Sequence, residues 1–187
     1  DYHWTSEVWP NPNGFNRYMK NMHEIQNIPS IVWEIKKRII EKENLHDAIE
    51  EPIFKDTIGV MKNGGQLHEH KDPNRYGLFH TRYNVYVQLP YVGGYPIYNN
   101  QVYKLKERTY ICCKAGIDLH YCEKVEGDRD RIILSYGFLL SKERIDLIES
   151  IHVDFDDTKI QITNLPSSIE EFTNAHNLDV NLKYTLI

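Results

Sequence analysis

From Ile53 onward the chain is a series of short apolar or alternating runs separated by closely spaced turn residues. Runs of about four to eight residues between such breaks are typical of β-strands, and they leave no room for the helices of βαβ units. The run 83–89 alternates with a period of two, so one of its faces should be buried. The expected strands are 57–61, 66–70, 83–89, 95–98, 101–105, 109–113 and 131–139.

Helical patterns flank this strand-rich region on both sides. Apolar residues recur at helical spacing between charged residues, which predicts a helix from about 30 to 44. Ser141 is a suitable N-cap for a second helix that runs to about 150. We also expect one short helix at 15–24, within an N-terminus made mostly of loops.

These patterns predict a mainly β fold with flanking N-terminal and C-terminal helices. Residues 1–150 should form one domain, in which an N-terminal helical layer packs on the β core. Residues 151–187 should form a C-terminal extension packed on or appended to it, with a strand or two and a short helix at 167–174.

The composition of the chain is that of an ordinary globular protein, with 187 residues, 41% hydrophobic and 26% charged. A formal net charge of −5 gives no support for nucleic acid as a partner. No apolar stretch approaches the roughly 20 residues of a membrane span. The three cysteines show no metal-binding spacing, and we expect reduced thiols in an intracellular, cytoplasmic protein.

Metal-ligating side chains are concentrated in the segment 64–72, which contains His68, His70 and Asp72. Residues two apart on a strand point to the same face, so His70 and Asp72 can share one where the strand ends. His120 lies at the end of another expected strand. Two imidazoles and a carboxylate on one face of a metal form the facial triad of non-haem iron enzymes, which leaves coordination positions open.

Arg131 opens the apolar run that forms the last expected strand. A charge at the head of a buried strand is costly unless it is paired. The planar fork of an arginine pairs well with a carboxylate, so Arg131 is a candidate for binding an acidic ligand. Arg129 is a weaker candidate, because it lies in an acidic turn.

The order and spacing of these residues resemble the 2-oxoglutarate/Fe(II) oxygenase superfamily, including its prolyl-hydroxylase-like and aspartyl/asparaginyl-hydroxylase-like branches. The resemblance covers 64–139. Its pattern consists of a glycine, a hydrophobe, His-x-Asp, a Gly-Gly pair, a distal histidine and a later basic residue. The matching residues are Gly64, Leu67, His70-Lys71-Asp72, Gly93-Gly94, His120 and Arg131.

The resemblance implies a double-stranded β-helix, or jelly roll, with the metal at its open end. It implies that His70, Asp72 and His120 bind Fe(II), and that Arg131 binds the far carboxylate of 2-oxoglutarate. The implied reaction hydroxylates a C–H bond of a protein side chain or a small molecule with O2, and converts 2-oxoglutarate to succinate and CO2. Ascorbate is a candidate reductant.

Arg82 and Asn84 are secondary candidates for binding the co-substrate. The sequence Arg82-Tyr83-Asn84 is similar to an Arg-x-His pair of the aspartyl/asparaginyl branch, although the second residue here is asparagine. Many members of that branch lack the metal carboxylate, whereas Asp72 is present in this chain. The branch is therefore left open.

Two alternatives belong to other functional classes. One is a cupin-like isomerase or sugar-binding module that uses His68, His70 and His120, although the glutamate usual in such sites is missing after His70. The other is a jelly-roll interaction domain without a catalytic metal.

Overall fold

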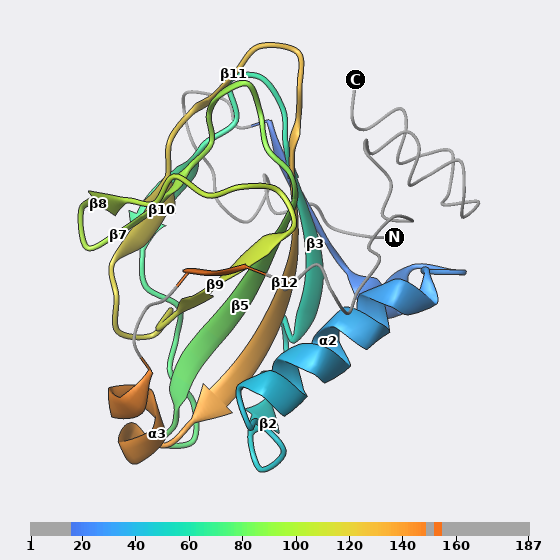
Figure 1. Ribbon diagram of the computed structural model, residues 1–187. Coiled ribbons are helices and arrows are strands. Elements are labelled where there is room, and N and C mark those ends of the chain that lie inside the picture. The colour runs from blue at the N-terminus through green and yellow to red at the C-terminus, as the bar shows by residue number, and fades with distance from the viewer. Residues whose placement is uncertain (1–15, 149–151, 155–187) are drawn as a thin grey trace.

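The computed structural model describes residues 16–148 and 152–154. This part of the chain is mainly β, and all its strand pairs are antiparallel. A large and a small sheet lie beside each other, with a long helix on the outside of the large one (Figure 1). The expectation of a mainly β fold is confirmed.

The large sheet has the strand order β1-β3-β12-β5-β9-β13, and β2 also pairs with β12. The central strands β5 and β12 are the longest, at ten residues each. The strands are β1 (Arg17–Asn21), β2 (Ile49–Glu50), β3 (Asp56–Met61), β5 (Phe79–Gln88), β9 (Thr109–Cys113), β12 (Arg131–Leu140) and β13 (His152–Asp154).

The small sheet has the order β4-β10-β7-β8, and a two-stranded ribbon pairs β11 with β6. From β3 to β12 the chain passes repeatedly between the large and the small sheet. The strands are β4 (Leu67–His70), β7 (Pro96–Tyr98), β8 (Gln101–Val102), β10 (His120–Cys122), β6 (Val92–Gly93) and β11 (Val125–Glu126).

The two faces of the large sheet have different roles, because side chains alternate along each strand. On β12, Ile132, Leu134 and Tyr136 belong to the main hydrophobic core. The helix α2 (Ser30–Lys42) contributes Val32 and Ile35 to the same core. The opposite face of β12 is turned toward a cavity that residues of the small sheet also line.

Both main helix predictions are confirmed. The expected helix 30–44 is α2, and α3 (Lys142–Leu147) begins after Ser141 but ends at Leu147, short of the expected 150. The hydroxyl of Ser141 accepts a hydrogen bond from the backbone of Arg144, which is the predicted N-cap interaction.

The expected short helix at 15–24 is wrong. Residues Arg17–Asn21 form strand β1, and only Met22–Glu24 form a single 3-10 turn, η1. Strand β1 pairs along its whole length with β3, so a long-range partner overrides the local preference. The expected strand at 101–105 is shortened to Gln101–Val102.

Strand β13 joins β9 at the edge of the large sheet. The helix expected at 167–174 lies outside the described residues.

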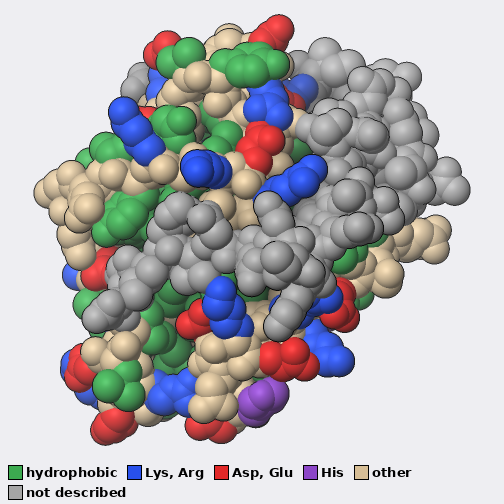
Figure 2. Space-filling model, viewed as in Figure 1, with side chains coloured by type: hydrophobic (Ala, Val, Ile, Leu, Met, Phe, Trp, Pro, Cys, Tyr) green, Lys and Arg blue, Asp and Glu red, His purple; other side chains and the backbone are tan. Residues whose placement is uncertain are grey.

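Charges of both signs are mixed over the face drawn in Figure 2. Within 16–148 and 152–154, no helix is long and apolar enough to cross a membrane. The thiols of Cys112, Cys113 and Cys122 are free and buried.

Candidate metal centre

His70 and His120 face each other on neighbouring strands. Strands β4 and β10 are antiparallel, and their register places His120 directly opposite His70. The two ring centroids are 4.2 Å apart. His120 begins β10, whereas the sequence pattern predicted that it ends a strand.

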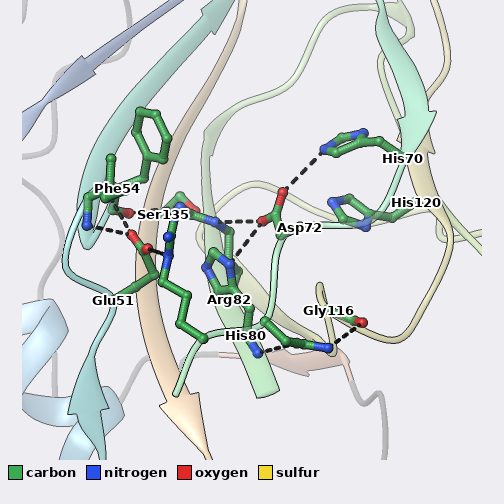
Figure 3. A network of polar contacts seen from close by, with 12 residues as sticks. Glu51, Phe54, His70, Asp72, His80, Arg82, Gly116, His120 and Ser135 are labelled. Carbon is green, nitrogen blue, oxygen red and sulfur yellow. Dashed lines mark hydrogen bonds and ion pairs between the residues drawn. The ribbon is translucent and has the colours of Figure 1, made fainter. Parts of the chain in front are cut away.

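Asp72 lies two residues beyond β4, and its backbone N–H donates to the carbonyl of Ala115 at 2.8 Å. The carboxylate of Asp72 points toward the two imidazoles (Figure 3). One ligand atom from each of His70, Asp72 and His120 lies within 4.8 Å of the others. His68 is exposed on β4 and is not part of this group.

Backbone carbonyls fix the orientation of both imidazoles. Nδ1 of His70 is 2.6 Å from the carbonyl oxygen of His68, and Nδ1 of His120 is 3.0 Å from that of Asp118. A carbonyl oxygen only accepts hydrogen bonds, so Nδ1 of each ring is the protonated nitrogen. The lone pair is therefore on Nε2, the atom that a metal would bind.

The electrostatics of the centre keep His120 and Asp72 in metal-binding protonation states. Burial, helped by the neighbouring His70, lowers the pKa of His120 to about 4, so its imidazole is neutral at neutral pH. Burial alone would raise the pKa of Asp72. The imidazole of His70, whose Nε2 lies 3.5 Å from Oδ1 of Asp72, and the charge of Arg82 outweigh burial and hold this pKa well below its usual range.

Arg82 of β5 holds the outer oxygen of Asp72. Its Nε donates to Oδ2 of Asp72 at 3.2 Å, while Oδ1 lies 3.5 Å from Nε2 of His70. The other two nitrogens of Arg82 donate to the Ser135 hydroxyl at 2.9 Å and the Phe54 carbonyl at 2.8 Å. The predicted co-substrate residue Arg82 thus contacts Asp72, the carboxylate of the candidate metal triad (Figure 3).

His80, also on β5, lies behind Asp72. Its Nδ1 is 3.7 Å from Oδ2 of Asp72, and only 2% of the residue is exposed. Burial, followed by the charge of Arg82, lowers the pKa of His80 to about 4. This imidazole is therefore neutral at neutral pH, and neither of its ring nitrogens has a hydrogen-bond partner among the described residues.

A cavity of about 150 Å³ begins at these residues and runs between the two sheets. A cavity of this size is large enough to hold a small organic molecule. Asn84 lines it, and its Oδ1 accepts a hydrogen bond from the Ser135 hydroxyl at 2.6 Å.

Arg131 lines the same cavity and is only 4% exposed. Its Nη2 is 3.4 Å from the hydroxyl of Tyr86, and its guanidinium lies over the Tyr86 ring. Its Nε has no hydrogen-bond partner within the described part of the chain. Burial raises the pKa of Tyr98, which also lines the cavity, so this phenol can donate a hydrogen bond beside Arg131.

The donor set fits a divalent metal ion of the iron type. Two imidazoles and one carboxylate form a facial triad that leaves coordination positions open. Among the described residues, no fourth His, Cys, Asp or Glu joins the group, as a closed structural zinc site would require.

Sequence reasoning missed Arg17 of β1, which also lines the cavity. The predicted helix at 15–24 concealed it, because only the pairing of β1 with β3 places it on the cavity side. The sequence indicated only that His80 lines a pocket or a loop, since a single histidine beside a threonine has no distinctive pattern, and His80 does line the cavity.

No family model matches the chain, and no curated protein is similar to it in sequence. Its fold resembles that of a viral collagen prolyl hydroxylase from Paramecium bursaria Chlorella virus 1, solved as a complex with 2-oxoglutarate. The TM-score is 0.54 at 17% identity, over 68% of this chain and 81% of the hydroxylase. The chain shares the fold of this hydroxylase.

A second solved structure that matches the chain is that of HygX from Streptomyces hygroscopicus, with nickel and 2-oxoglutarate bound. It is 10% identical, over 78% of this chain and 82% of HygX, with a TM-score of 0.49.

Proposed function

We propose that the protein is an Fe(II)- and 2-oxoglutarate-dependent oxygenase that hydroxylates a C–H bond and converts 2-oxoglutarate to succinate and CO2. The observation that carries this proposal is the convergence of His70, Asp72 and His120 at the wall of a cavity. The fold shared with a prolyl hydroxylase supports it. The passage of the chain between two sheets agrees with a double-stranded β-helix.

In this proposal Nε2 of each histidine and one oxygen of Asp72 hold the iron. The Nδ1 hydrogen bonds to backbone carbonyls keep both rings in the required tautomer. Arg82 occupies Oδ2 of Asp72 and leaves Oδ1 on the side of His70, so Asp72 offers a single oxygen.

Arg131 binds the far carboxylate of 2-oxoglutarate. Its unpartnered Nε and its burial make a guanidinium that needs an anion. Tyr86 and Tyr98, which both remain protonated because burial raises their pKa, stand beside it as further hydrogen-bond donors. Asn84 lies in the same cavity, where its side-chain amide can contact the co-substrate.

Bound iron would activate O2 as the oxidant, and the decarboxylation of 2-oxoglutarate to succinate and CO2 would supply two of the electrons that O2 takes up. The chain's own residues position both groups and exclude water. Met61, Pro96 and Ile133 are apolar side chains on the cavity wall, and they limit the water that can reach the reacting C–H bond.

The test is an anaerobic titration of the metal-free protein with Fe(II) and 2-oxoglutarate, followed through the visible metal-to-ligand charge-transfer band. We expect a band in the wild type that disappears in His70→Ala. The control is His68→Ala, which changes an exposed histidine two residues away on the same strand. This variant should keep the band.

The two histidine variants also separate the alternatives. A wild-type protein that binds metal tightly but shows no band, and loses metal in His68→Ala, would be a cupin-like protein and not an oxygenase. A wild type that binds no metal would leave a jelly-roll interaction domain.

A further inference from the structure

Arg17 and Arg131 lie on the same face of the large sheet. Arg17 of β1 is in register with Met61 of β3, and Met61 is in register with Arg131 of β12. Residues at one register level of a sheet point to the same face, and all three line the cavity. The two arginines are two strands apart, which corresponds to roughly 10 Å between their Cα atoms.

The charges on the cavity wall are not balanced. Four arginines line it, but only two carboxylates do, Glu51 and Asp72. Arg82 pairs with Asp72, and Arg75 pairs with Glu51. Within the described residues this leaves Arg17 and Arg131 without a carboxylate.

The surroundings of Arg17 do not compensate its charge. Its Nη2 donates a hydrogen bond to the sulfur of Met19 at 3.9 Å, and a thioether is a weak acceptor. Burial, with Arg131 nearby, lowers the pKa of Arg17 to about 10, so the side chain stays cationic at neutral pH. Arg17 is partly buried, and an anion beside it would offset the cost of holding a cation there.

A single 2-oxoglutarate does not account for both arginines. Its far carboxylate belongs with Arg131 in the proposed function, and its other end belongs at the metal. The bound metal also adds positive charge to a cavity that already has an excess of it. Arg17 therefore remains available for a second anion.

We propose that Arg17 binds the carboxylate of the primary substrate, so that the oxygenase acts on a small carboxylic acid. This inference rests on the proposed function, because it takes the bound acid to be the substrate of the oxygenase. The fork of Arg17 can pair with a carboxylate through two parallel hydrogen bonds. Arg17 and the three candidate metal ligands line one cavity, so the anionic group and the reacting carbon of such a substrate would lie in the same cavity.

The probe for this site is acetate, with acetamide as its neutral counterpart at constant ionic strength. Binding is measured by calorimetry and by the thermal unfolding midpoint, on protein saturated with Fe(II) and 2-oxoglutarate without O2. The variants are Arg17→Gln, Arg17→Lys and Arg131→Gln. The matched control is Arg108→Gln, which removes an exposed arginine that does not line the cavity.

We expect acetate, and not acetamide, to bind the wild type and Arg108→Gln. Arg17→Gln should weaken acetate binding about tenfold or more, and change the 2-oxoglutarate affinity by less than about twofold. Arg17→Lys keeps the charge but loses the planar guanidinium, so its acetate affinity should lie between those of the wild type and Arg17→Gln. Arg131→Gln should instead weaken the binding of 2-oxoglutarate.

Three results would overturn the inference: no acetate binding by the wild type, unchanged binding by Arg17→Gln, or loss of 2-oxoglutarate affinity in Arg17→Gln to the same extent as in Arg131→Gln. The last would make Arg17 part of the co-substrate site. The charge-transfer band separates the two proposals. If the band is missing while acetate binding depends on Arg17, only the oxygenase proposal fails.

Discussion

The carboxylate of Asp72 is held from behind by residues that are not metal ligands. Arg82 reaches it from β5, and the same guanidinium joins β12 through Ser135 and the loop before β3 through the carbonyl of Phe54. A side chain with three anchored nitrogens is rigid, so Asp72 has little freedom to rotate. At the scale of single residues, the geometry of the centre depends on Arg82 as much as on its ligands.

Arg82→Lys should therefore weaken metal binding by about 10- to 100-fold, because lysine keeps the charge but cannot make three divergent hydrogen bonds. The measurement is an anaerobic Fe(II) titration of the variant, compared with Arg75→Lys, which changes another arginine of the cavity wall. Unchanged metal affinity with a large loss of 2-oxoglutarate affinity would show that Arg82 binds the co-substrate, as its sequence context predicted.

The residues that could be predicted from the sequence are those whose partners are encoded locally or by a familiar spacing. His70 and Asp72 belong to one short segment, and His120 follows at a spacing that a known family shares. Arg17 could not be found in this way, because its position depends on the pairing of β1 with β3. Arg82 could be singled out, but its contact with Asp72 could not be predicted, since this contact joins β5 to a loop.

At the scale of elements, α2 stabilises the sheet that carries Arg131 without contacting the metal centre. Ile35 of α2 is fully buried in the main core. Tyr136 of β12 donates its hydroxyl hydrogen to the carbonyl of Val32 at 2.7 Å and fixes the helix on the sheet. The cavity lies on the opposite face of the same strand, so core and site are separated by one layer of backbone.

Ile35→Ala should lower the free energy of unfolding by about 2–5 kcal/mol, through lost burial and the space left behind. Urea denaturation of the metal-free protein measures this change. Lys37→Ala, on the exposed side of α2, should change stability by less than about 0.5 kcal/mol. The folded Ile35→Ala protein should keep wild-type Fe(II) affinity within about twofold. A larger loss would mean that the helix layer shapes the metal centre.

The elements could be predicted where a local pattern decides, either a short apolar run or an amphipathic spacing. Strand β9 spans the expected residues 109–113, and the amphipathic spacing placed α2 within two residues of its true end. Strand β1 was missed, and β8 was predicted too long. In both cases pairing with a neighbouring strand, and not the local sequence, sets where the strand lies and how long it is. Long-range pairing is the information that a single sequence does not contain.

At the scale of the whole molecule, the core and the metal centre draw on different residues. The main core consists of side chains from α2 and from one face of the large sheet. The three ligands and the arginines line the opposite face or belong to the small sheet. We therefore expect the chain to fold without the metal, in contrast to small zinc domains that unfold without it.

Removal of the metal with a chelator should leave a folded protein that unfolds cooperatively at a lower temperature. At a free metal concentration 100 times the Kd, binding to the native state alone adds about 2.7 kcal/mol to the free energy of unfolding. Calorimetry of the wild type with and without metal, alongside far-UV circular dichroism, measures both effects. His70→Ala should match the metal-free wild type within about 1 kcal/mol and gain nothing from added metal, because it lacks a ligand but keeps the core. A metal-free wild type without cooperative unfolding would show instead that the centre holds the two sheets together.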